Sequence, residues 1–173
     1  MSRDAAGRSE PIRSLTELIE RLGTAGVGLA ELLDSLAEAV TIRNPQHEII
    51  HANRAAVEHM HLDSLEELQQ RGVNSIISDY IIQDEQGNQL TMADVPSVRQ
   101  LAGETAESLL MRTVHRTTGE AKWDLLKSTL LRDEAGEAIA TVTIIEDVTL
   151  EKTAELRQRF LARASETLMS SID

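Results

Sequence analysis

Three β-prone segments in the second half of the sequence, at 108–116, 121–132 and 138–146, restrict the fold more than any other feature. Each is rich in Leu, Val, Ile and Thr, as expected of strands. Short polar loops that contain Gly119 and Gly136 separate them. Because loops this short join antiparallel neighbours, the three segments predict an antiparallel meander.

The middle segment does not reveal which of its faces is buried. Alternate residues of a strand point to opposite faces, which separates Trp123, Leu125, Lys127 and Thr129 from Asp124, Leu126, Ser128 and Leu130. Neither group is wholly apolar, so the core-facing side of this strand stays open.

The last predicted strand continues into a helix without an intervening loop. Apolar residues in the segment 150–173 recur at steps of three, four or seven, which favours a helix. We expect the hydroxyl of Thr149 to cap its first turn. A strand joined directly to a helix couples the two mechanically, so Asp147 and Thr149 are candidate signal-relay residues, with Arg157 as an ion-pair partner for Asp147.

The first half predicts two further strands and several short helices. The runs 39–43 and 47–51 flank an Asn-Pro turn and predict a hairpin. Helices are expected to begin near Asn53 and Asp63 and to span 95–103, whereas 76–77 and 81–82 are only short apolar patches. Five antiparallel strands, with helices between the second and third, predict an α+β fold.

The chain divides into three parts. Residues 1–28 predict an extension with one amphipathic helix, which begins at the capping box Ser14 to Glu17. Residues 29–149 form the main domain, with a short helix at 29–38. Residues 150–173 form a linker helix, which could begin a following domain.

Composition excludes several kinds of chemistry. Hydrophobic residues make up 41% of the 173 residues but aromatic residues only 2%, so the core must be aliphatic. No cysteine is present, which excludes disulfides, thiolate metal sites and photochemistry that forms a flavin–cysteine adduct. The five histidines are scattered and predict no metal site.

Charge and hydropathy limit the partners. The net charge is −12 and no cluster of Lys and Arg is visible, which argues against direct nucleic-acid binding. No apolar run approaches the roughly 20 residues that cross a bilayer, and no secretory signal is visible. We therefore expect a cytoplasmic protein without a membrane partner.

Several segments together resemble the PAS sensor-domain family over 32–149. The segment 36–42 resembles the entry into the first strand, and 49–56 resembles the second strand with the Asn that begins the next helix. The segments 119–123 and 131–136 resemble the hairpins beside the fourth strand. Asp147-Val148-Thr149 resembles the family's Asp-x-Thr signature at the end of the last strand.

The resemblance implies a PAS fold with five antiparallel strands, short helices on one face, an N-terminal helical extension and a C-terminal signalling helix. It also implies a ligand site between the helices and the inner face of the sheet. The residues that we expect there are Ile42, Ile50, Val57, Met60, Ile76, Ile77, Leu109, Met111, Leu126 and Ile144. A plain packed core without a ligand is an equal alternative.

The identity of any cofactor stays open. The scarcity of aromatic residues argues against a stacked flavin, and the absence of His from the helix at 95–103 argues against haem. A small or aliphatic ligand fits the composition better.

A homodimer is expected through two apolar series, with the alternative that the last helix folds back on its own sheet. The residues concerned are Leu15, Leu18, Ile19, Leu22, Leu150, Ala154, Leu161, Ala164 and Leu168. The tail 159–173 resembles the opening of GAF domains that follow PAS domains in bacterial phosphatases and histidine kinases.

We therefore expect a sensory module of a bacterial signal-transduction protein, acting on an effector domain in the same polypeptide or on a partner signalling protein. No phosphate loop, nucleophile elbow or other catalytic motif is visible, so we expect no enzyme. The alternatives are a ligandless dimerisation scaffold and a small-molecule enzyme on an α+β sheet.

Overall fold

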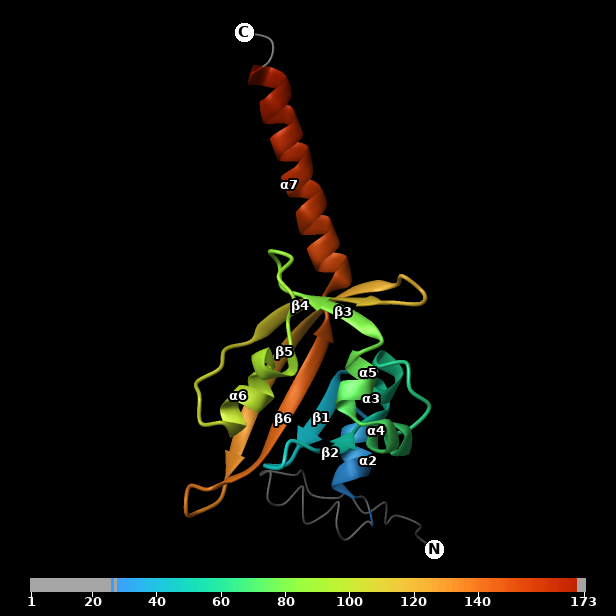
Figure 1. Cartoon of the computed structure of the whole chain (residues 1–173), viewed down its shortest axis with the longest axis vertical. Helices are drawn as coiled ribbons and strands as arrows, with labels where there is room; N and C mark the ends of the chain where they lie inside the picture. Colours follow the sequence, from blue (N-terminus) through green and yellow to red (C-terminus); the bar gives the residue numbers. More distant parts are fainter. Residues whose placement is uncertain (1–25, 27, 171–173) are drawn as a thin grey trace, which may run out of the picture.

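One antiparallel sheet of six strands carries the fold, in the order β2-β1-β6-β5-β4-β3. The computed structural model describes residue 26 and residues 28–170 (Figure 1). The strands are β1 (Ala39–Arg43), β2 (Ile49–Ala52), β3 (Tyr80–Gln83), β4 (Leu109–His115), β5 (Ala121–Arg132) and β6 (Ala138–Asp147). The meander β4-β5-β6 and the hairpin β1-β2 were both predicted from the sequence.

The α+β fold and the antiparallel sheet are confirmed, but the predicted number of five strands is wrong. The apolar patch at 81–82 belongs to a sixth strand, β3, in which Tyr80 pairs with His115 and Gln83 with Arg112. This edge strand has only four residues, which is too short for alternation to distinguish a strand from an apolar loop.

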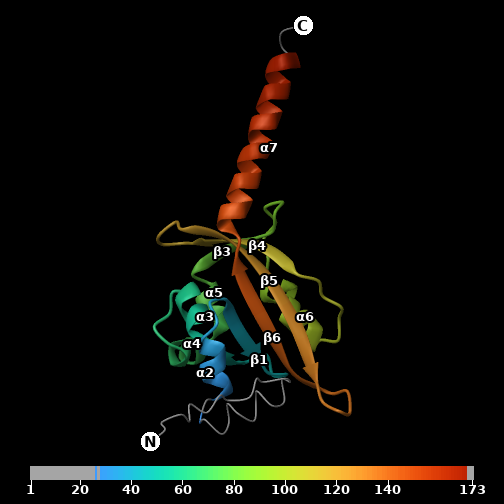
Figure 2. The same cartoon turned by 180° about the vertical axis from the view of Figure 1, so that it is seen from behind.

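Short helices cover one face of the sheet, and one long helix leaves its end. In Figures 1 and 2, α3 to α6 lie on the same side of the sheet, and α7 points away from the domain. The helical elements are α2 (Leu29–Asp34), α3 (Arg54–His59), α4 (Leu65–Arg71), α5 (Val73–Ile77), η1 (Met92–Asp94), α6 (Pro96–Leu101) and α7 (Thr149–Ser170). The helix expected at 29–38 ends earlier, at Asp34, and the one expected near Ser14 lies outside the described residues.

Strand register decides which residues face the helices. Thr41 of β1 pairs with Thr143 of β6, and Leu126 of β5 pairs with Ile145 of β6. Residues that pair directly across antiparallel strands point to the same face, and all four line the cavity beneath the helices. The inner side of β5 is therefore the one that carries Asp124 and Leu126. The sequence alone had not shown which side of this strand faces the core.

The packed core occupies only part of this inner face. It lies around β1, β2 and the helices α3 to α5 and is built from small and aliphatic side chains: Ala39, Ala52, Ala56, Val57, Leu62, Leu68 and Ile76. Side chains of this size fill the corner beside β1 and β2, and the inner face of β3 to β6, together with Thr41 and Arg43 of β1, borders a cavity.

Asn53 holds this corner together. The residue is fully buried, with 0% of its surface exposed. Its Oδ1 accepts hydrogen bonds from the backbone N–H of Val40 and of Ala56, both at 2.9 Å. Its Nδ2 donates to the carbonyl oxygens of Leu33 at 3.0 Å and Glu38 at 2.9 Å. One side chain thus joins α2, the entry to β1, and the first turn of α3.

We expect Asn53→Ala to destabilise the domain strongly. The change leaves the buried N–H groups of Val40 and Ala56 without this partner, which costs roughly 2–6 kcal/mol at about 1–3 kcal/mol for each unsatisfied group. The thermal midpoint should fall by roughly 10 °C for a domain of this size. Asn88→Ala is the matched control, because Asn88 is exposed and bonds only to Asp84. Similar midpoints for the two variants would contradict the role of Asn53.

Candidate functional site

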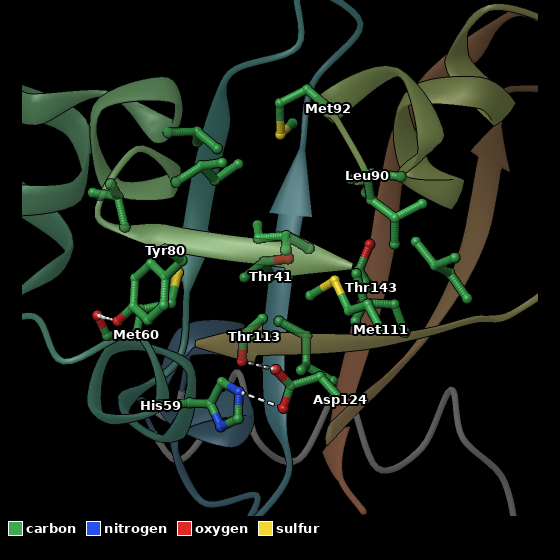
Figure 3. Close-up of a pocket in the computed structure, with 18 of the residues that line it drawn as sticks. Thr41, His59, Met60, Tyr80, Leu90, Met92, Met111, Thr113, Asp124 and Thr143 are labelled. Carbon is green, nitrogen blue, oxygen red and sulfur yellow. Dashed lines mark hydrogen bonds and ion pairs between the residues drawn. The ribbon is translucent and has the colours of Figure 1, made fainter. Parts of the chain in front are cut away.

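A cavity of about 150 Å³ lies between the inner face of the sheet and the short helices. Its wall is mostly apolar, and both the sheet and the short helices contribute side chains to it, as Figure 3 shows. Three of the five methionines of the chain, Met60, Met92 and Met111, line it. A space of this size and polarity suits a small apolar ligand, since an engineered apolar cavity of about 150 Å³ binds benzene.

The cavity has one polar end. Asp124 of β5 is 2% exposed, and its Oδ2 accepts a 3.0 Å hydrogen bond from the Thr113 hydroxyl. Its Oδ1 lies 3.0 Å from Nε2 of His59, a contact that lacks the alignment of a hydrogen bond. His59 is the last residue of α3, so this contact joins a helix to the sheet across the cavity (Figure 3).

The structure brings six of the ten expected pocket residues together. Met60, Ile76, Ile77, Leu109, Met111 and Leu126 all line the cavity. Ile42 and Ile144 lie on the opposite face of the sheet, because their neighbours Thr41 and Thr143 point inward. Ile50 lines a separate outer groove, and Val57 belongs to the packed core.

The junction between β6 and α7 is tied to β5. The hydroxyl of Thr149 accepts a 2.9 Å hydrogen bond from the backbone N–H of Trp123, and the N–H of Val148 donates at 2.8 Å to the Trp123 carbonyl. Thr149 is therefore not the cap that the sequence predicted, because its oxygen serves a strand. Asp147 Oδ1 instead accepts the N–H of Thr149, the first helical residue, at 3.0 Å.

Lys152, and not Arg157, is the basic residue that holds the base of α7. Its side chain is buried, and its Nζ contacts Glu85 in the turn after β3 and Glu155 Oε2 at 2.9 Å. Hydrogen bonds with these two carboxylates raise the pKa of Lys152. The ammonium also lies 5.7 Å from the centroid of the Trp123 ring, within the range of a cation–π contact.

The expected pair between Asp147 and Arg157 does not form among the residues that the structure describes. Arg157 lies two turns farther along α7, a rise of roughly 12 Å from Thr149. Partial burial pushes the pKa of Asp147 up, but hydrogen bonding to Thr149 and the charges of His59 and Lys122 outweigh it, and the pKa lies below its usual value. The carboxylate is thus ionised at neutral pH without Arg157.

Sequence comparison now identifies the family. A model of the family described as the PAS fold matches residues 33–153. This chain belongs to the PAS-fold family. The resemblance found in the sequence is therefore confirmed, and the cavity and the junction belong to a PAS domain. No curated protein matches the sequence significantly.

Solved structures with a similar fold include light-oxygen-voltage domains. One, an RNA-binding light-oxygen-voltage receptor, has a TM-score of 0.54 and 19% identity, over 90% of this chain and 41% of the receptor. Another, the light state of the Aureochrome1 LOV domain, a blue-light photoreceptor, has a TM-score of 0.49 and 19% identity, over 76% of this chain and 98% of that one. At such identities the likeness shows the fold alone, and the chain spans less than half of the receptor.

The C-terminal helix α7 of this PAS domain presents apolar side chains to solvent. Leu150 is 84% exposed, Phe160 71% and Leu161 55%. Of the residues expected at a dimer interface, Ala154 is also exposed and Ala164 is half-buried. The side chain of Leu168 and the residues Leu15, Leu18, Ile19 and Leu22 lie outside the described part of the chain.

Two long-range contacts of the PAS domain were missed in the sequence. His59 and Asp124 are far apart along the chain, and each looks like an ordinary surface residue of a helix or a strand. Lys152 looks like a solvated helix residue, because its partner Glu85 lies in a distant turn. The only usable signal was the alternation of β5, which places Asp124 on the same side as Leu126.

Two searches of the described residues were negative. No group of three or more His, Cys, Asp or Glu side chains in that part of the chain could hold a metal ion. None of the helices described has the length and apolar character needed to span a membrane.

We expect Lys152→Met to loosen the base of α7. The variant keeps the bulk of the side chain but removes the contacts with Glu85 and Trp123, so the thermal midpoint should fall by about 2–4 °C. The emission of Trp123, the only tryptophan, should also change. Lys127→Met is the control, because Lys127 of β5 forms a more exposed pair with Glu146 of β6. Equal effects of the two changes would contradict a special role of Lys152.

Proposed function

We propose that this PAS domain is the sensory module of a bacterial signalling protein and that α7 carries its output. A ligand in the cavity would change the posture or pairing of α7. An effector domain in the same polypeptide, or a partner signalling protein in the cytoplasm, would receive the change. We further propose that the module has no enzymatic activity of its own.

The observation that carries this proposal is the double role of β5. Asp124 and Leu126 of this strand face the cavity. Trp123, the neighbour of Asp124, points to the other face, and its backbone binds both Val148 and Thr149 at the start of α7. Any shift of β5 that follows filling of the cavity therefore acts on the helix through directly bonded neighbours.

The energies involved are sufficient for such a relay. An empty cavity costs about 24 cal/mol per Å³ in core mutants, so 150 Å³ corresponds to at most about 4 kcal/mol. A ligand that fills the space recovers part of this free energy. A bias of a few kcal/mol is enough to shift a two-state equilibrium substantially.

Asp147 and Thr149 are the proposed relay residues, with Lys152 in place of Arg157. Together they attach the first turn of α7 to β5 and to the turn after β3. Their contacts are few and partly exposed, so two arrangements of the helix can differ little in free energy. A relay needs this property, since a rigidly buried helix could not respond.

We expect Met111→Phe, which partly fills the cavity, to mimic a ligand. Because the chain has no cysteine, Gln158→Cys on the exposed side of α7 accepts a single spin label. Met111→Phe should shift both the Trp123 emission and the distance distribution between labels of two subunits. Ile144→Phe on the outer face is the control and should change neither. Unchanged distances and emission in Met111→Phe would contradict the relay.

We also propose that the domain is a homodimer through α7. Leu150 and Leu161 are eleven residues apart and therefore lie within about 20° of each other around the helix. Both side chains are exposed, which favours packing of α7 against a partner helix over packing against the sheet of its own subunit.

Leu161→Glu should weaken the dimer by at least tenfold, because a charge would enter the apolar seam. Leu156→Glu is the matched control, since Leu156 is also an exposed leucine but lies about 140° around the helix from Leu161. Sedimentation equilibrium of the full chain measures both dissociation constants. A stronger effect of Leu156→Glu would place the seam on another face.

A further inference from the structure

Arg43 is a buried cation without a carboxylate partner. It belongs to β1, and only 7% of its surface is exposed. Its Nη1 donates a 2.6 Å hydrogen bond to the carbonyl of His47. No Asp or Glu of the described residues lies within ion-pair distance of its guanidinium. Most of the five N–H donors of this side chain therefore remain available.

The guanidinium stands between two cavities. Arg43 lines the inner cavity, and it also lines an outer groove of about 780 Å³ beside β2, α4 and α5. Four apolar residues belong to both walls as well: Ile49, Leu68, Val73 and Met92. A ligand that passes from the groove into the inner cavity would cross this shared wall.

The other arginine of the groove is already paired. Arg71 contacts Glu67 at 3.2 Å and also Asp79. The carboxylate of Glu48, which also lines the groove, accepts a 2.8 Å hydrogen bond from the neutral side chain of Asn44 and keeps its negative charge. The groove thus offers a single uncompensated positive charge, that of Arg43.

This charge is costly where it lies. Burial lowers the pKa of Arg43, but a guanidinium stays protonated at neutral pH. A buried charge without a counterion loses part of its hydration, and the one carbonyl of His47 replaces only some of it. An anion that binds beside Arg43 would restore that loss.

We propose that Arg43 anchors the carboxylate of a small apolar acid, whose apolar part lies in the inner cavity. This proposal rests on the proposed function and specifies its ligand. A guanidinium matches a carboxylate with two parallel hydrogen bonds. One positive charge balances one carboxylate, whereas a phosphate dianion would need the second cation that Glu67 and Asp79 have already neutralised.

Octanoate and octanamide separate the charge from the apolar part of such a ligand. Both have the same length and shape, and only octanoate carries the negative charge. Calorimetric titration of the full chain should give at least tenfold tighter binding of octanoate. In Arg43→Gln, octanoate should lose this advantage and bind with about the same affinity as octanamide. Arg71→Gln is the matched control and should keep the preference, since Arg71 is paired in the free protein.

If Arg43→Gln does not fold, Arg43→Lys replaces it in the experiment. This variant should retain only part of the preference for octanoate over octanamide, because an ammonium keeps the charge without the planar fork of a guanidinium. Equal affinity of octanoate and octanamide in the unaltered chain would overturn the role of Arg43 but leave the cavity as a ligand site. An octanoate preference that survives in Arg43→Gln would overturn it too. Absence of binding by both would overturn the proposed acid, and the Met111→Phe experiment would still test the relay.

Discussion

The four hydrogen bonds of Asn53 are the constraint on which the rest of the structure depends. They fix α2, β1 and α3 relative to one another from a position without solvent contact. The amide of an asparagine side chain has two acceptor sites and two donors, and in Asn53 all four form hydrogen bonds. These bonds hold the corner at β1 and β2 together, and the small side chains of the core pack around it. The inner face of β3 to β6, by contrast, borders the cavity.

In this arrangement β5 lies between the cavity and the base of α7. Its neighbours β6 and β4 are held to it by continuous pairing, but its inner face meets an open space near Leu126 and Asp124 and not a filled core. The base of α7 is attached to the outer side of the same strand and by Lys152 to the turn after β3. In the order of the sheet, β5 lies two strands away from β1, so the junction is tied to a different part of the sheet from the corner that Asn53 holds.

Much of the fold followed from local patterns, and the site followed only in part. Strand alternation and glycine turns predicted the meander, and several short segments together indicated the family, among them Asn53 at the start of a helix and Asp147-Val148-Thr149. The edge strand β3 was missed because four residues give no periodic signal. Six of the ten expected residues line the cavity, because apolar residues of helices and strands mostly point into the protein. Ile42 and Ile144 were misplaced because one residue of register decides the face of a strand. His59 with Asp124, and Lys152 with Glu85, are contacts between distant segments, which no local pattern encodes.

The composition of the cavity wall bears on how a PAS domain of this kind can discriminate between ligands. Met60, Met92 and Met111 have flexible, polarisable side chains, which repack around different apolar shapes. Selection by shape alone would therefore be weak. Discrimination has to come from polar groups at fixed positions, where a mismatched ligand leaves a buried charge or hydrogen-bonding atom unpaired. The cavity has two such positions, the His59–Asp124 contact and the guanidinium of Arg43. Asp124 lies on β5 and Arg43 on β1, so a ligand that binds either one adopts a defined orientation relative to β5. A defined orientation at β5 is what a sensor needs if the same ligand is always to give the same change in α7.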